Sequence, residues 1–191
     1  MAHGSHFLSV HVLYQLSLDV SLHVSNTKTR KFAFLAALFH VISPAGMFLS
    51  APYAESSFSF LNFAGFFLYA RSHRERFGGR DGKSCVLLAA SGLLFGLAST
   101  FRSNGLLSGM IFCSEAIDTT VALLKLHNIG ANLQHLCAVF LTGGFVAFGA
   151  ITPQYLAYRE YCVHTDSLED IRPWCSKWVP SIYTWVQDYY W

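Results

Sequence analysis

The stretch LQHLCAVFLTGGFVAFGAITPQY, residues 133–155, decides the class of fold. It contains no Asp, Glu, Lys or Arg, and it is longer than the roughly 20 residues that a helix needs to cross the hydrocarbon core of a bilayer. Gly143, Gly144 and Gly149 lack side chains, so a second helix can approach this one closely. The stretch therefore predicts a membrane-spanning helix that packs tightly against a neighbour.

The composition of the whole chain agrees with a membrane protein. Of its 191 residues, 53% are hydrophobic and only 13% are charged, whereas soluble domains carry about 25% charged residues. Charged residues are missing from several long blocks, which favours an all-α polytopic membrane protein over a large soluble core. The net charge of +2 is too small to argue for nucleic acid, so no nucleic-acid partner is expected.

Six apolar blocks are candidates for spanning or re-entrant helices. Asp19 and His23 interrupt the first block, and Pro44 and Gly46 are expected to break or kink the second. We therefore expect a transmembrane helix bundle of about six segments over residues 1–155, followed by an aromatic-rich loop over residues 156–191. The blocks cover residues 7–24, 32–47, 54–70, 85–101, a stretch that begins near 106, and 133–155.

Two basic loops predict how the segments are oriented. The loops are TKTRK, residues 27–31, and RSHRERFGGRDGK, residues 71–83. Because cytoplasmic loops carry an excess of Lys and Arg, both loops should face the cytosol. Counting membrane crossings from them then puts residues 43–55, residues 101–105 and the tail 156–191 on the opposite face. Three polar segments are therefore expected to share one end of the bundle.

Glu55 and Arg102 are the charged residues of most interest on that face. Glu55, in SAPYAES (residues 50–56), either stabilises a helix N-terminus or lines a substrate site at the membrane boundary. Arg102, in FRSNG (residues 101–105), opposes the orientation bias. It either pairs with Glu55 or grips an anionic ligand such as a phosphate. Asn104 beside it is also ordinary turn chemistry.

The tail holds all four tryptophans of the chain and two of its five cysteines. Aromatic residues at this density suit a loop that lies along the membrane interface, although stacking platforms for sugar rings would look similar. Cys162 and Cys175 pair if the tail faces an oxidising compartment, which their spacing alone does not show. No Cys or His spacing suits zinc, so no metal site is expected. The tryptophans are Trp174, Trp178, Trp185 and Trp191.

Glu115 and Asp118 stand three residues apart within the fifth apolar block. Residues at this spacing share one face of a helix. Either both carboxylates line a polar interior, or the block surfaces from the membrane early, near Ser114. Of these two interpretations we favour early surfacing.

Three motifs in this order, SAPYAES, FRSNG and RPWCSKWVPSIYTWVQDYYW (residues 172–191), resemble the phosphatidylinositol-glycan class V family of GPI mannosyltransferases. The resemblance runs over nearly the whole chain. It implies a C-type glycosyltransferase helix bundle in the endoplasmic-reticulum membrane, multi-pass, with its active face lumenal. It also implies transfer of the second mannose, in α-1,6 linkage, from dolichyl phosphate mannose to the GPI glycolipid acceptor. No cofactor is expected beyond that lipid-linked donor.

The resemblance also implies substrate-binding roles for the polar residues. Arg102 and Asn104 would cradle the lipid-linked sugar phosphate, and Tyr53 and Glu55 match positions of the family's own motif. Arg172 and Trp174, from the tail motif, complete the candidate substrate-binding set.

The chain departs from the family pattern at both ends. Such enzymes carry an essential acidic residue in their first lumenal loop, which is expected upstream of this chain. Their tail motif continues into further helices, so the resemblance implies that the loop over residues 156–191 is lumenal and truncated. We therefore expect a middle section of a longer enzyme, inactive alone, with an accessory membrane subunit as one further partner. The rival interpretation from another class is a non-catalytic membrane scaffold or assembly subunit. A transporter is disfavoured because inverted repeats are lacking.

Overall fold

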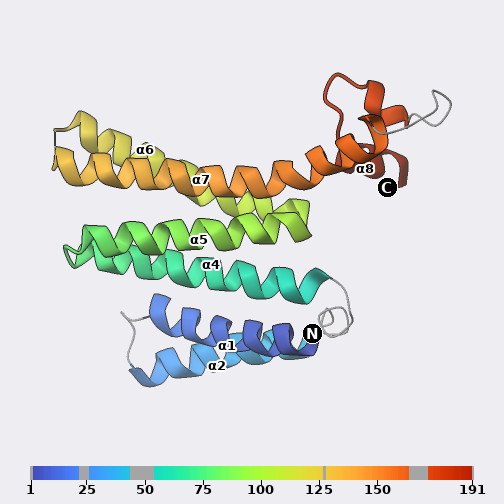
Figure 1. Ribbon diagram of the computed structural model, residues 1–191. Coiled ribbons are helices and arrows are strands. Elements are labelled where there is room, and N and C mark those ends of the chain that lie inside the picture. Colours follow the sequence, from blue (N-terminus) through green and yellow to red (C-terminus); the bar gives the residue numbers. More distant parts are fainter. Residues whose placement is uncertain (1, 22–25, 44–53, 127, 164–171, 191) are drawn as a thin grey trace.

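Every regular element in the described part of the chain is a helix (Figure 1). The computed structural model describes residues 2–21, 26–43, 54–126, 128–163 and 172–190. Over these residues the predicted all-α class is confirmed. The long helices are α1 (Ala2–Val20), α2 (Asn26–Ile42), α4 (Ala54–Phe77), α5 (Asp81–Phe101), α6 (Met110–Leu124) and α7 (Ile129–Tyr158).

Short helical segments join or extend the long ones. A 3-10 helix, η1 (Ser103–Gly109), leads from α5 into α6, and a π-helical turn, η2 (Arg159–Val163), continues α7. The tail then forms a 3-10 turn, η4 (Pro173–Ser176), and a short helix, α8 (Ile182–Tyr190). The predicted break of the second block at Pro44 and Gly46 lies outside the described residues.

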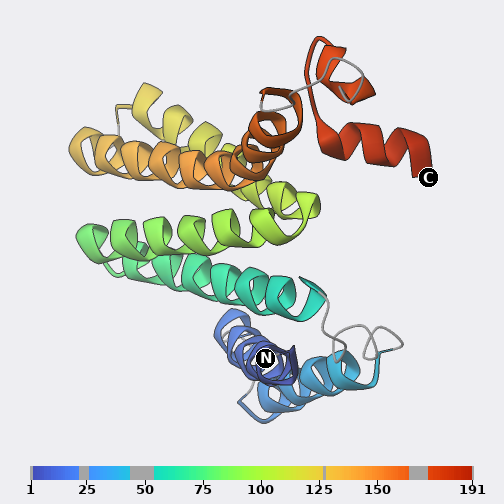
Figure 2. The same ribbon diagram turned by 45° about the vertical axis from the view of Figure 1, so that its right-hand side comes forward.

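The helices form a row of antiparallel hairpins rather than a closed ring (Figures 1 and 2). α1 pairs with α2, α4 with α5, and α6 with α7, while α1 also packs on α4 and α5 packs on α7. The order across the molecule is therefore α2, α1, α4, α5, α7, α6. This open arrangement leaves broad outer faces on the outer helices.

Three of the described helical stretches are long and apolar enough to cross a membrane: Asp81–Phe101, Ser103–Leu124 and Ile129–Val163. They confirm the polytopic class. The described parts of the first three predicted blocks are helical too, but their helices carry more polar residues. In particular, α4 continues past the predicted end at residue 70 to Phe77, because residues 71–76 of the expected basic loop are its last turns.

A tight glycine turn joins α4 to α5. The amide N–H of Gly78 donates to the carbonyl of Arg74 at 3.1 Å, and that of Gly79 donates to the carbonyl of Arg76 at 2.9 Å. Gly79 has a φ of +73°, in the left-handed region that helix C-caps require and that side chains disfavour. This turn holds α4 and α5 side by side over their lengths.

Glycine also sets the separation of α5 and α7. A Cβ atom added to Gly149 would clash with the backbone of Gly96, so the two helices touch backbone to backbone there. This confirms the predicted role of Gly149. The expectation for Gly143 and Gly144 is wrong, since a Cβ at either would meet no atom of the described residues within 4 Å.

The apolar core lies between the four helices α4, α5, α6 and α7. Phe95 of α5 is fully buried and presses on Gly65 of α4, where an added Cβ would lie 2.7 Å from the Phe95 ring. Large apolar side chains also point outward, among them Phe140 and Phe148 of α7, which are 66% and 71% exposed. Apolar exposure on that scale is expected of faces that contact lipid or further protein. The core cluster is Leu88, Phe95, Phe112, Val139 and Val146.

Candidate functional site

The described parts of the three polar segments that were expected to share one face lie at one end of the bundle (Figure 1). We call it the tail end: it holds the start of α4, the end of α5 with η1, and the described parts of the tail, residues 159–163 and 172–190. The opposite end, called the turn end, holds the α4–α5 turn, the end of α6 and the start of α7. Counting crossings from the sequence predicted this arrangement correctly.

At the tail end, Glu55 and Arg102 form an ion pair. Arg102 Nη1 lies 3.6 Å from Glu55 Oε1, and the two side chains are 45% and 30% exposed. The guanidinium of Arg102 also lies 5.9 Å from the centre of the Phe58 ring. Glu55 sits in the first turn of α4, where the helix dipole favours a negative charge. The helix-terminus and ion-pair interpretations therefore both hold.

The ion pair leaves binding capacity unused. Glu55 Oε2 is buried and accepts no hydrogen bond from the described residues, and a buried carboxylate oxygen is costly unless a donor reaches it. Arg102, half exposed, engages Glu55 through one nitrogen at a long distance, whereas a guanidinium carries five N–H donors. Within the part of the chain that the structure describes, one acceptor and several donors therefore remain for a ligand.

The other predicted site residues surround this pair less closely. Asn104, in η1, and Arg172, in the tail, are both exposed. Trp174 is only 2% exposed, so protein covers its ring and it supports the tail rather than offering a face for stacking. Tyr53 lies outside the described residues. Substrate binding by these four residues stays a prediction.

The tail is fastened internally and to α7. Cys162 and Cys175 form a disulfide with their Cα atoms 5.7 Å apart, which is the pairing that the sequence left open. The hydroxyl of Ser181 donates to Gln154 Oε1 of α7 at 2.6 Å. These bonds hold the tail at the end of α7, on the same end of the bundle as Arg102.

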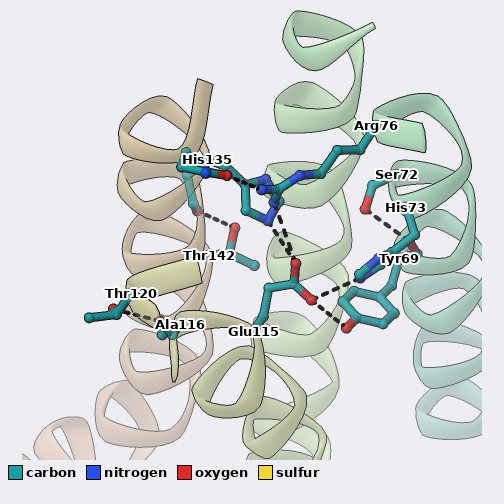
Figure 3. Close-up of polar contacts among 11 residues, drawn as sticks. Tyr69, Ser72, His73, Arg76, Glu115, Ala116, Thr120, His135 and Thr142 are labelled. Carbon is teal, nitrogen blue, oxygen red and sulfur yellow. Dashed lines mark hydrogen bonds and ion pairs between the residues drawn. The ribbon is translucent and has the colours of Figure 1, made fainter. Parts of the chain in front are cut away.

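A second polar cluster is buried between α4, α6 and α7 (Figure 3). Its centre is the carboxylate of Glu115, which is 9% exposed. Tyr69 donates its hydroxyl to Oε2 at 3.0 Å, and His135 Nε2 lies 2.8 Å from Oε1. His73 Nε2 lies 2.9 Å from Oε2, but its alignment is too poor for a hydrogen bond, so we treat this contact as electrostatic. Arg76 Nη1 completes the ring at 3.6 Å.

This arrangement explains how a carboxylate can be buried there. A buried charge is costly unless it is both paired and hydrogen-bonded, and two other helices supply the donors for Glu115. A carboxylate accepts only, so Nε2 of His135 carries the proton in their hydrogen bond. Arg76 is fixed in turn, because its Nη2 donates to Asn132 Oδ1 at 2.7 Å. The cluster therefore joins three helices at one depth.

The structure corrects our interpretation of Glu115 and Asp118. α6 continues as a helix to Leu124 instead of surfacing near Ser114, and Glu115 lines a polar interior. Asp118 is exposed. Both line a pocket of about 540 Å³ at the turn end, together with His73, Arg76 and Asn132.

Sequence reasoning missed the partners of Glu115, although a signal was present. Tyr69, His73 and Arg76 follow one another at spacings of four and three residues, which places them on one face of α4. A polar stripe on a helix next to apolar blocks indicates a buried polar partner. Within the ranges that the structure describes, no group of three or more His, Cys, Asp or Glu side chains is placed to hold a metal ion.

Comparison with known proteins assigns the chain to a family. The family model for the mannosyltransferase PIG-V matches residues 4–191. GPI mannosyltransferase 2 of Aspergillus oryzae is 42% identical over 194 residues, covering 100% of this chain and 43% of that protein. The protein of the same name from Gibberella zeae is 40% identical over 191 residues, covering 100% of this chain and 42% of that protein.

A mammalian relative is similar over a shorter stretch. GPI alpha-1,6-mannosyltransferase 2 of Rattus norvegicus is 35% identical over 182 residues, covering 83% of this chain and 34% of that protein. The chain thus spans less than half the length of the relatives it matches. No solved structure matches the chain. The resemblance carried by SAPYAES, FRSNG and the tail motif is confirmed: the chain belongs to the PIG-V mannosyltransferase family.

Proposed function

We propose that the whole protein containing this chain transfers mannose from dolichyl phosphate mannose to a GPI precursor in the endoplasmic-reticulum membrane. The mannose would be the second of the glycan, in α-1,6 linkage. Family membership over residues 4–191 and the names of the relatives support a GPI mannosyltransferase. The donor is an activated sugar, so the proposed reaction requires no cofactor.

The observation that carries this proposal is the partly unsatisfied Glu55–Arg102 pair. In the proposed transfer, the bond between mannose C1 and the donor phosphate oxygen breaks and dolichyl phosphate leaves with the bonding electrons. C1 bonds to the oxygen of an acceptor hydroxyl, whose proton passes to the acidic residue expected upstream of this chain, acting as a base in its carboxylate form. Negative charge develops on the departing phosphate, and a half-exposed guanidinium is suited to stabilise it. Oε2 of Glu55 accepts no hydrogen bond from the described residues and is suited to accept one from a hydroxyl of the sugar or of the acceptor.

We further propose that the tail end faces the lumen. Lys and Arg concentrate near the turn end, as expected of a cytosolic face. The Cys162–Cys175 disulfide lies at the tail end, and disulfides persist in oxidising compartments such as the endoplasmic-reticulum lumen. These two observations are independent and support the same orientation.

Complementation of cells that lack the second GPI mannosyltransferase tests the proposal. The whole protein should restore GPI-anchored protein at the cell surface, and Arg102→Ala should lose this rescue at unchanged protein abundance. Arg102→Lys should rescue partly, because an ammonium keeps the charge but not the paired donors. Lys177→Ala is the matched control, since Lys177 is another half-exposed cation of the tail end, 3.4 Å from Asp188, and should rescue fully.

Mannosyl transfer in isolated membranes separates the proposal from the scaffold alternative. If Arg102→Ala acts in donor binding, transfer falls, and the KM for the donor rises in the conservative Arg102→Lys variant. Failure of the abundant wild-type protein to rescue would contradict the proposed function. Full transfer by Arg102→Ala, combined with lost co-purification of a membrane partner, would favour a scaffold.

A further inference from the structure

A small basic pocket lies at the turn end, between the last turns of α4 and the first turns of α5. Its volume is about 350 Å³. It shares no lining residue with the pocket beside Glu115. The end of α4 and the start of α5, which line it, lie at the opposite end of the bundle from the end of α5 (Figure 1). Its lining consists of Arg71, Arg74, Glu75, Arg80, Lys83 and Leu87.

The pocket carries an excess of positive charge. Arg71 Nε and Arg74 Nη2 lie 3.2 Å and 2.6 Å from the same oxygen of Asp19. Arg80 and Lys83 share Glu75, with Lys83 Nζ 2.9 Å from its Oε1. Four cations therefore share two carboxylates, which leaves a local charge of about two positive.

The cations also keep donors that these carboxylates do not use. The four basic side chains are 44–62% exposed, whereas Asp19 and Glu75 are each 15% exposed. The carboxylates are thus covered and the cationic groups face outward. Guanidinium and ammonium groups in this arrangement suit the oxygens of a phosphate.

One residue of the lining is apolar. Leu87 lies one turn beyond Lys83 in α5, a helix apolar enough to cross a membrane. Val86 beside it is 69% exposed on the same helix. The pocket therefore lies where a membrane-spanning helix begins, and its lining combines charged side chains with an apolar one.

We propose that this pocket binds the phosphate of an anionic phospholipid in the leaflet at the turn end. An orientation signal alone requires only that basic residues lie near the boundary, whereas here four of them line one cavity together with an apolar side chain. Leu87 favours a lipid over free phosphate, because the glycerol and the first chain carbons would cover it. The site stands apart from mannosyl transfer; naming the leaflet cytosolic rests on the orientation proposed above.

Native mass spectrometry of the whole protein in mild detergent tests the site. The probe is dioctanoyl phosphatidylserine, with dioctanoyl phosphatidylcholine as the neutral comparison. The double variant Arg80→Gln/Lys83→Gln should bind phosphatidylserine about tenfold more weakly. The control Lys28→Gln/Lys31→Gln removes the same charge from exposed residues of α2 near the turn end and should change binding less than twofold.

A gain-of-binding variant guards against misfolding as an explanation. Glu75→Gln releases Arg80 and Lys83 from their carboxylate, so phosphatidylserine should bind several-fold more tightly. Equal losses in the pocket and control variants, or equal binding of phosphatidylcholine, would overturn the proposal. Displacement of the lipid by millimolar inorganic phosphate would also overturn the proposal, because it would show that the pocket binds a free anion rather than a phospholipid. The assay does not read mannosyl transfer, so its failure is separable from failure of the proposed function.

Discussion

Glu115 and His135, twenty residues apart in the sequence, meet with Oε1 and Nε2 2.8 Å apart between α6 and α7. His135 is 4% exposed and Glu115 is 9% exposed. The contact binds α6 to α7 beside the packing of α7 on α5, and Tyr69 extends it to α4. One carboxylate therefore helps to set the relative depth of three helices.

Replacing Glu115 by glutamine, which has the same shape but no charge, should destabilise the bundle. Glu115→Gln removes the charge that both histidines and Arg76 face, and we expect the free energy of unfolding to fall by about 2 kcal/mol. Thermal unfolding of the purified protein in detergent measures this as a lowered Tm. Asp118→Asn, one turn away and exposed, should stay within about 0.5 kcal/mol of the wild type.

A double-mutant cycle would separate the contact from general damage. Tyr69→Phe removes one hydroxyl donor to Glu115 Oε2 and leaves the ring in the core. The effects of Tyr69→Phe and Glu115→Gln should be less than additive, because the two residues share one hydrogen bond. Additive effects would mean that this contact does not stabilise the fold.

Two glycines of α7 should respond oppositely to the same substitution. Gly149→Ala places a Cβ against the backbone of Gly96, which cannot move aside as a flexible side chain can, and should cost about 1–3 kcal/mol. Gly143→Ala meets open space in the described part of the molecule and should gain about 0.5–1 kcal/mol from helix propensity. Comparing the two Tm values tests the close approach of α5 and α7; equal shifts would contradict it.

The fold class and the direction of each helix were predictable because they depend on patterns within short windows. The uncharged stretch 133–155 and the basic loops carry that information locally. Details of packing depend on which residues of another helix lie opposite. Gly149 faces Gly96 whereas Gly143 faces none of the described atoms, and the spacing of glycines within α7 cannot distinguish the two.

The candidate site was also predictable only where local patterns carry the information. Loop charges correctly brought Glu55 and Arg102 to one end, and the ion pair was one of two stated alternatives. The burial of Glu115 was missed because a carboxylate in an apolar block is costly unless partners are known. Its partners come from α4 and α7, and no pattern in the residues around Glu115 indicates them.

The ion pairs of Glu75 predict a pH dependence at the turn end. Hydrogen bonds from Lys83 and Arg80 hold the pKa of Glu75 below its ordinary value. A carboxylate whose pKa is lowered in the folded state contributes stability that is fully present above its unfolded-state pKa of about 4.3. This stability is lost as the pH falls through the folded-state pKa. The Tm difference between wild type and Glu75→Gln should therefore be constant near neutral pH and vanish in acid.

A second variant tests the cause assigned to that pKa. Lys83→Gln removes the main hydrogen-bond donor to Glu75 and so lowers the folded-state pKa of Glu75 less, which makes the loss of stability in acid smaller and complete at a higher pH than in the wild type. Thermal unfolding at a series of pH values from neutral to strongly acidic gives both curves. An unchanged midpoint in Lys83→Gln would assign the lowered pKa to Arg80 alone.

The Cys162–Cys175 disulfide should stabilise the tail locally. The cysteines stand 13 residues apart. In the chain-entropy description, closing a loop of this size lowers the entropy of the unfolded chain, which stabilises the folded state by about 3 kcal/mol. Cys162→Ser should therefore speed proteolysis within the tail while leaving the Tm of the helix bundle nearly unchanged, because both cysteines lie in the tail and neither belongs to the apolar core cluster. Cys113→Ser, at an exposed free cysteine, is the matched control.

The Cys162–Cys175 disulfide also reports orientation in cells. If the tail end is lumenal, maleimide should label Cys162 and Cys175 only after reduction. Rapid labelling without reductant in intact microsomes would place the tail in a reducing compartment and contradict the proposed orientation.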